Sequence, residues 1–212
     1  MQSTMDVRDA IDQISAIRTQ LARTERLKSL RAVPVALSGV LALVAAAAQS
    51  VWIQDPATEP FRYLVLWVGA ALISGLAASM EVLRRTHASR SELGVANVRL
   101  AVEQFAPCTV AGAIVTAVIA TRHPELLWLL PGLWQVLFGL GNLAAHRLLP
   151  SPAFAVGAFY LITGAICLLL GEAALQPWAM GLPFAGGQGA LAAILWWQQE
   201  RPIGPTATEH SR

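Results

Sequence analysis

Apolar residues occur in six long runs along the chain, and polar residues gather between these runs. The runs cover about residues 34–53, 62–80, 105–121, 126–145, 152–171 and 178–197. Each run is close to the roughly 20 residues that an α-helix needs to cross a hydrocarbon core of about 30 Å. A soluble protein of this size can bury one or two such helices, but not six. The pattern therefore predicts an all-α integral membrane bundle of six transmembrane helices.

The polar segments divide the chain into three parts. Residues 1–31 are expected to form an amphipathic helix in the cytoplasm or at the membrane surface. Residues 32–198 hold the transmembrane domain, with a helical cytoplasmic loop over 82–104. The tail, 199–212, has two prolines and no apolar period, and it is expected to be disordered. The chain is only 13% charged, about half the usual share for a soluble domain, which agrees with this division.

The positions of Lys and Arg predict how the bundle is oriented. Thirteen of the fifteen basic residues fall on the side of residues 1–31, and only Arg62 and Arg122 fall on the other side. Cytoplasmic loops carry the excess of basic residues in membrane proteins. We therefore expect a multi-pass protein of the cell inner (plasma) membrane with both termini in the cytoplasm. The loops on the opposite side are too short for an extracellular receptor domain.

The predicted N-terminal helix offers a surface for lipid or for a partner. Apolar and basic side chains separate onto different faces at helical spacing. The residues assigned to this surface are Ile11, Ile14, Arg18, Leu21, Arg23 and Arg26. Three interpretations stay open at this point. The helix lies in the headgroup layer, packs against a helix at 89–104, or docks a soluble partner or a second copy of the chain.

Each run has an inner face of small or weakly polar residues, and in the first run this face holds Ser38, Ala42, Ala45 and Gln49. The fourth run carries its own set at regular spacing. Gln135, Gly139, Asn142 and His146 follow one another at intervals of four, three and four, which places them on one helix face. Gln135 is expected near mid-depth, as is Gln188 in the sixth run. An amide buried in hydrocarbon needs a hydrogen-bond partner. The expected partners are the other glutamine, Ser38, Thr116, or backbone freed by Pro131 and Pro183.

Two interpretations compete for these intramembrane polar residues. In the first, which we favour, they hold helices together, and the small residues beside them let helix backbones approach closely. In the second, they line a path for a solute. The residues assigned to this polar seam or solute path are Gln135, Asn142, Gln188 and Tyr160.

The sequence argues against several kinds of chemistry. No charged residue falls in mid-membrane, whereas a proton-driven pump normally needs an intramembrane carboxylate. The histidines lack metal-ligand spacing, and the two cysteines, Cys108 and Cys167, fall at different depths. No phosphate-binding loop or nucleophile motif is present. We therefore predict no enzyme activity, no metal and no cofactor. The net charge of +2 comes from segregated Arg and predicts no nucleic-acid partner.

Two functional hypotheses follow from the sequence. The first is a polytopic inner-membrane protein that acts by interaction, as a membrane anchor or regulatory subunit. Its partners would be the lipid bilayer and a soluble cytoplasmic protein or a second copy of the chain. The alternative is a small transporter or channel for a neutral or weakly polar solute.

Overall fold

The regular structure of this chain is helical throughout the residues that the structure describes. The structure, a computed structural model, describes residues 32–88, 92–145 and 151–200. The elements are α2 (Ala32–Trp52), α3 (Pro60–Ala88), α4 (Glu92–Arg122), η1 (Pro124–Leu129), α5 (Leu130–Ala144), α6 (Ala153–Leu170), η3 (Gly171–Leu175) and α7 (Pro177–Glu200). The predicted N-terminal helix lies outside the described residues. So does the predicted tail, apart from the two residues by which α7 extends into it.

Among the described residues, six helical segments are long and apolar enough to cross a membrane. They are Ala32–Trp52, Pro60–Glu81, Val102–Arg122, Pro124–Ala144, Ala153–Leu175 and Pro177–Trp197. Each overlaps one of the six apolar runs of the sequence. For the part of the chain that the structure describes, the prediction of an all-helical protein with six such helices is confirmed.

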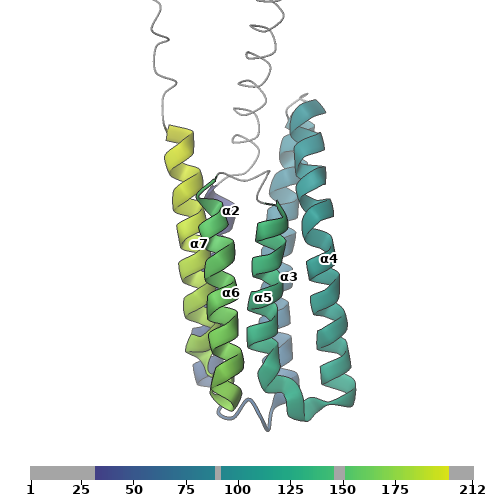
Figure 1. Ribbon diagram of the computed structural model, residues 1–212, viewed down its shortest axis with the longest axis vertical. Coiled ribbons are helices and arrows are strands. Elements are labelled where there is room, and N and C mark those ends of the chain that lie inside the picture. Colours follow the sequence, from purple (N-terminus) through teal and green to yellow (C-terminus); the bar gives the residue numbers. More distant parts are fainter. Residues whose placement is uncertain (1–31, 89–91, 146–150, 201–212) are drawn as a thin grey trace, which may run out of the picture.

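The long helices follow one another around the bundle in the order of the chain. Each packs against the next one, and α7 closes the bundle by packing along α2. In Figure 1, helices α4 to α7 form a front layer, with α2 and α3 behind them. Short connections at the lower end of Figure 1 explain this order, because a helix joined by a tight turn has to return beside its predecessor. Residues 53–59, η1 and η3 make these connections, and we call this end of the bundle the lower end.

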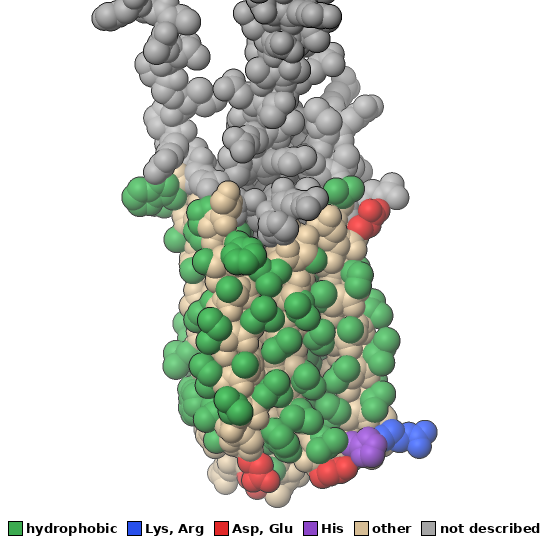
Figure 2. All heavy atoms as spheres, in the orientation of Figure 1, with side chains coloured by type: hydrophobic (Ala, Val, Ile, Leu, Met, Phe, Trp, Pro, Cys, Tyr) green, Lys and Arg blue, Asp and Glu red, His purple; other side chains and the backbone are tan. Residues whose placement is uncertain are grey.

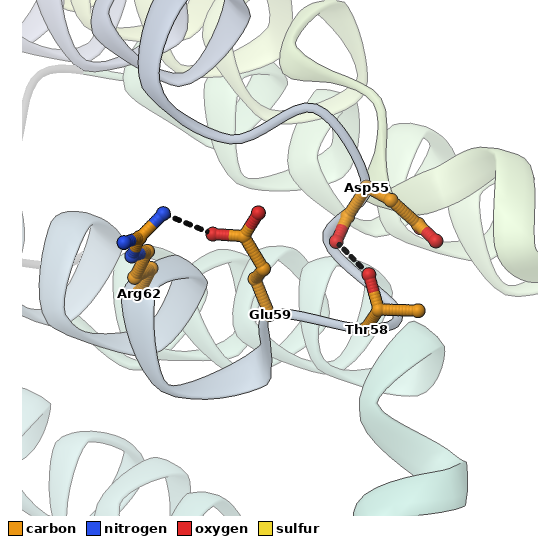
Figure 3. Close-up of polar contacts among 4 residues, drawn as sticks. All are labelled: Asp55, Thr58, Glu59 and Arg62. Atoms are coloured by element: carbon orange, nitrogen blue, oxygen red, sulfur yellow. Dashed lines mark hydrogen bonds and ion pairs between the residues drawn. The ribbon is translucent and has the colours of Figure 1, made fainter.

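The turn between α2 and α3 shows how local polar contacts set one of these connections (Figure 3). The Asp55 side chain accepts a hydrogen bond from the Ala57 backbone N–H at 3.1 Å. The Thr58 hydroxyl donates to the Asp55 backbone carbonyl at 3.1 Å. Glu59, just before α3, pairs with Arg62 one turn into the helix. An aspartate that bonds the backbone two residues further on favours such a turn, so this segment reverses the chain at the lower end.

Helices α3 and α4 are longer than their apolar segments. Helix α3 has 29 residues and α4 has 31, and both pass beyond Glu81 and Val102, where the apolar segments end. At 1.5 Å per residue, the extensions are roughly 10 and 15 Å long. Figure 1 shows both helices reaching past the upper ends of α5 and α6. Within the predicted helical segment 82–104, residues 82–88 are the end of α3 and residues 92–104 are the start of α4. Residues 89–91, between the two helices, are not among the described residues.

The apolar surface is distributed unevenly among the helices. In the segment Pro124–Ala144, which includes α5, 44% of the apolar stretch is buried inside the bundle, and α7 has the same share. The corresponding share is 11% in α3 and 6% in α4. Figure 2 shows green apolar side chains covering the length of the bundle, with charged side chains at its ends. The interior is therefore formed mainly by α5, α6, α7 and α2, while α3 and α4 are peripheral.

Candidate functional site

The seam between α5 and α6 is a contact between two helix backbones. Four glycines line it: Gly132 and Gly139 on α5, and Gly157 and Gly164 on α6. A Cβ atom added at Gly139 would lie 2.9 Å from the carbonyl oxygen of Gly157, and one at Gly164 would lie 2.8 Å from that of Gly132. Neither backbone can move aside at such distances. The seam therefore requires glycine at these positions.

Gln135 is completely buried and binds the backbone of α7. Its Nε2 donates to the Ala179 carbonyl at 3.0 Å and lies 3.2 Å from Cys167 Sγ. In a continuous helix, the Ala179 carbonyl would accept from the N–H of residue 183. Pro183 has no N–H, so this carbonyl is left without its helical donor. One of the predicted partners of Gln135, backbone freed by Pro183, is the one that the structure shows.

Gln49 of α2 makes a similar contact one turn earlier. Its Nε2 donates to the Leu175 carbonyl at 2.6 Å, and its Oε1 accepts a hydrogen bond from Trp67 Nε1 at 2.7 Å. The sequence interpretation placed Gln49 on the inner face of the first run but did not single it out as a site residue. The available signal was an amide near the end of an apolar run, which needs partners as much as Gln135 does.

Together these contacts hold the start of α7 from several sides. We call the group of Gln49, Trp67, Gln135 and Cys167, with the Leu175 and Ala179 carbonyls, the α7 clamp. It joins α2, α3, α5 and α6 to η3 and α7. Aromatic side chains extend it outward. The Tyr63 ring stacks on the Trp134 ring at a centroid distance of 6.4 Å, and Trp134 Nε1 donates to the Thr116 hydroxyl at 2.9 Å.

The structure separates Gln188 from Gln135. Gln188 is buried on the side of α7 that faces α2, where its Cβ lies 3.1 Å from the position of a Cβ added at Gly39. Nine residues of α7 separate it from Ala179, a rise of roughly 13 Å. A bond between Gln135 and Gln188, one of the alternatives that the sequence left open, is therefore not formed.

The other predicted partners of Gln135 are also occupied elsewhere. The Ser38 hydroxyl donates to the Val35 carbonyl of its own helix at 2.7 Å. The Thr116 hydroxyl accepts from Trp134, as described above, and donates to Gly112. The placement of these groups follows from the order of helices around the bundle, which the sequence alone does not specify.

Asn142 and Tyr160 are buried, but in separate contacts. Asn142 Nδ2 donates to the Phe138 carbonyl of its own helix at 2.9 Å. The Tyr160 ring lies directly against Gly187, and its hydroxyl donates to the Phe184 carbonyl at 3.4 Å. Phe138 and Phe184 pack on the same ring. The four residues of the predicted seam or path thus lie in different contacts and do not converge on one point.

Other predicted site residues cannot be placed. His146 lies outside the described residues, as do the six residues of the predicted partner or lipid surface: Ile11, Ile14, Arg18, Leu21, Arg23 and Arg26. Within 32–88, 92–145 and 151–200, no three His, Cys, Asp or Glu side chains come together in a way that suits a metal ion. The side chains of the α7 clamp are neutral amides, an indole and a thiol. This arrangement binds backbone carbonyls.

These observations define the class of protein as an all-helical bundle of six helices that are apolar enough to cross a membrane, with α7 held at its start by buried amides. Comparison of the chain with known protein families, with curated proteins and with solved structures finds no match.

Proposed function

We propose that this chain is a polytopic protein of the cell inner membrane, with both termini in the cytoplasm, that acts by interaction. In this proposal the bundle is an anchor or regulatory subunit. The upper extensions of α3 and α4, together with residues 1–31, engage a soluble partner, a second copy of the chain, or the membrane surface. The thirteen basic residues on one side support this orientation.

The observation that carries the proposal is that the intramembrane polar residues are used in packing. Gln135 binds the Ala179 carbonyl, Asn142 binds Phe138, and Tyr160 is packed between aromatic rings and α7. A solute path needs polar groups that are free to contact the solute and that follow one another along the bundle. The alternative, a small transporter or channel, rests on the same residues and is supported less well.

The proposal is tested on the full chain in native membranes. Ile11→Ser, Ile14→Ser and Leu21→Ser would be combined in one variant, and Arg18→Glu, Arg23→Glu and Arg26→Glu in another. We expect both variants to insert and fold like the wild type, and to lose a specific cross-linked product that the wild type forms in the membrane. The matched control is Ile203→Ser in the C-terminal tail, which should retain the product.

Two results would count against the proposal. If both N-terminal variants keep the cross-linked product, those six residues are not the interaction surface. If the wild type moves a small neutral solute into reconstituted vesicles, and Gln135→Leu stops the movement without lowering thermal stability, the transporter alternative replaces it.

A further inference from the structure

Three buried side-chain polar atoms lack a hydrogen-bond partner among the described residues; one is Gln104 Oε1 of α4, and the other two lie at or beside the α7 clamp. These two are Tyr63 Oη and Gln135 Oε1. Both side chains are 0% exposed. Buried hydroxyls and amide carbonyls in proteins almost always bind another protein group or an ordered water molecule. A further bound group is therefore needed to satisfy the hydrogen-bonding capacity of these two atoms.

The two atoms belong to the same part of the interior. Tyr63 and Met180 are members of one cluster of buried side chains at the lower end, and Met180 Sδ lies 3.9 Å from Gln135 Nε2. The Tyr63 ring also stacks on Trp134, the residue before Gln135. Tyr63 comes from α3, Gln135 from α5 and Met180 from α7. The unpaired groups thus lie where three helices meet.

Their hydrogen-bonding capacities are complementary. Tyr63 Oη has a proton to donate and lacks an acceptor. Gln135 Oε1 is an acceptor, and the Nε2 of the same amide is already used on Ala179. Because the surrounding side chains are neutral, the bound group has to be a small neutral molecule that both accepts and donates a hydrogen bond. Water meets these requirements. A buried water molecule needs at least two hydrogen-bond partners, and Tyr63 Oη and Gln135 Oε1 provide two.

We propose that one buried water molecule binds between Tyr63 Oη and Gln135 Oε1 and links α3 to the α7 clamp. It accepts a hydrogen bond from the tyrosine and donates one to the glutamine. A small alcohol has the same chemistry, so the experiments use buffers without glycerol or other alcohols.

The chain provides a matched control, because it has two tyrosines and both are 0% exposed. The Tyr160 hydroxyl donates to the Phe184 carbonyl, so it has the partner that Tyr63 lacks. The proposal therefore predicts water at Tyr63 and none at Tyr160.

The first experiment is hydroxyl-radical footprinting by X-ray radiolysis of the full chain in lipid vesicles, in water labelled with oxygen-18. Radicals form from water that is already bound, so a buried side chain is modified only when water lies beside it. We expect label at Tyr63 and Met180, and at least fivefold less label at Tyr160. Tyr63→Phe should remove the label at Met180, whereas Tyr160→Phe should leave it. Equal protection of Tyr63, Met180 and Tyr160 in the wild type would overturn the proposal.

The second experiment compares the melting temperatures of Tyr63→Phe and Tyr160→Phe in detergent. If water bridges the two atoms, Tyr63→Phe lowers the melting temperature, because Gln135 Oε1 loses its donor. The combination with Gln135→Met then costs less than the sum of the two single changes. If the Tyr63 hydroxyl has no partner at all, Tyr63→Phe raises the melting temperature, and the proposal is wrong. Since the footprinting of the wild type needs no variant, a variant that fails to fold does not prevent the test.

Discussion

Two segments of this chain have similar sequences, but their glycines have opposite surroundings. Residues 67–75 of α3 read WVGAALISG, and residues 155–164 of α6 read AVGAFYLITG. In α6, a Cβ added at Gly164 would lie 2.8 Å from the Gly132 carbonyl oxygen of α5, and one added at Gly157 would lie 2.7 Å from the Leu143 side chain of the same helix. In α3, Gly69 and Gly75 have nothing within 4 Å of an added Cβ. A glycine in an apolar helix thus permits another helix to approach closely, but the close contact forms only where a neighbouring helix lies against that glycine.

The same contrast extends to the side chains around these glycines. On α6, Val156, Tyr160 and Cys167 are buried against other helices. On α3, the apolar side chains near Gly75 point away from the bundle: Leu72 is 62% exposed and Leu76 is 63% exposed. In a soluble protein such a surface would be unfavourable. In a bilayer it would have the same polarity as the lipid tails, so a peripheral helix can carry such a surface there.

The largest effect is expected from a charge on the exposed face of α3. Leu72→Arg places a guanidinium in the middle of the apolar stretch, where insertion costs about 3 kcal/mol. We expect the inserted fraction of this variant to fall strongly, as measured by fractionation of membranes after expression. The control is Leu83→Arg, which is beyond the apolar segment and should insert normally. Normal insertion of Leu72→Arg would show that this face does not contact lipid.

A smaller loss of stability is expected at the seam. In Gly164→Ala, the new methyl group would lie 2.8 Å from the Gly132 carbonyl oxygen and 2.9 Å from the Val136 backbone nitrogen. The helices have to separate, at a cost of about 1–3 kcal/mol. Thermal unfolding in detergent measures this cost. Gly75→Ala is the control in α3, and it should leave stability unchanged or raise it by up to about 1 kcal/mol, because alanine favours helix. Equal effects at the two positions would contradict the comparison.

The third prediction concerns the hydrogen bond from Gln135 to the Ala179 carbonyl, as distinct from the backbone contact at the seam. Gln135→Leu leaves the Ala179 carbonyl without its main donor, and we expect a loss of about 0.6 to 2 kcal/mol. Pro183→Ala restores an N–H that can bond this carbonyl within α7. The double variant should therefore regain most of the stability that Gln135→Leu loses. If Pro183→Ala shifts the melting temperature equally with and without Gln135, the carbonyl is not what Gln135 stabilises.

The smallest effect is expected for the pairing of the two glutamines. Gln188 lies roughly 13 Å along α7 from Ala179, the residue that Gln135 binds. The changes of Gln135 and Gln188 to leucine should therefore add within about 0.5 kcal/mol. The measurement is a double-mutant cycle of melting curves. A larger coupling would mean that the two amides share a partner.

Much of the candidate site could be anticipated, but not its connections. The stripe of Gln135, Gly139 and Asn142 was recognised from its spacing, and Pro183 was identified as a source of free backbone. Gln49 was placed on an inner face without a role. Its role depends on the Leu175 carbonyl, 126 positions away, and on Trp67 of the next helix. Such partners depend on which helices are neighbours and on how far each is shifted along its axis, and neither is encoded in local spacing.

The sequence by itself determined the number of helices, their approximate ends and the positions where a backbone carbonyl lacks a donor. These features follow from the length of the apolar runs and from the chemistry of proline, which act locally. The tertiary structure decided that α5, α6, α7 and α2 form most of the interior, whereas α3 and α4 bury only a small share of their apolar residues. It also decided that Gln135 binds Ala179 and not Gln188. The physical reason is that residues facing the core and residues facing outward are both apolar in these helices. Hydropathy therefore does not indicate which face of a helix is buried, and only the packing of one helix on another selects that face.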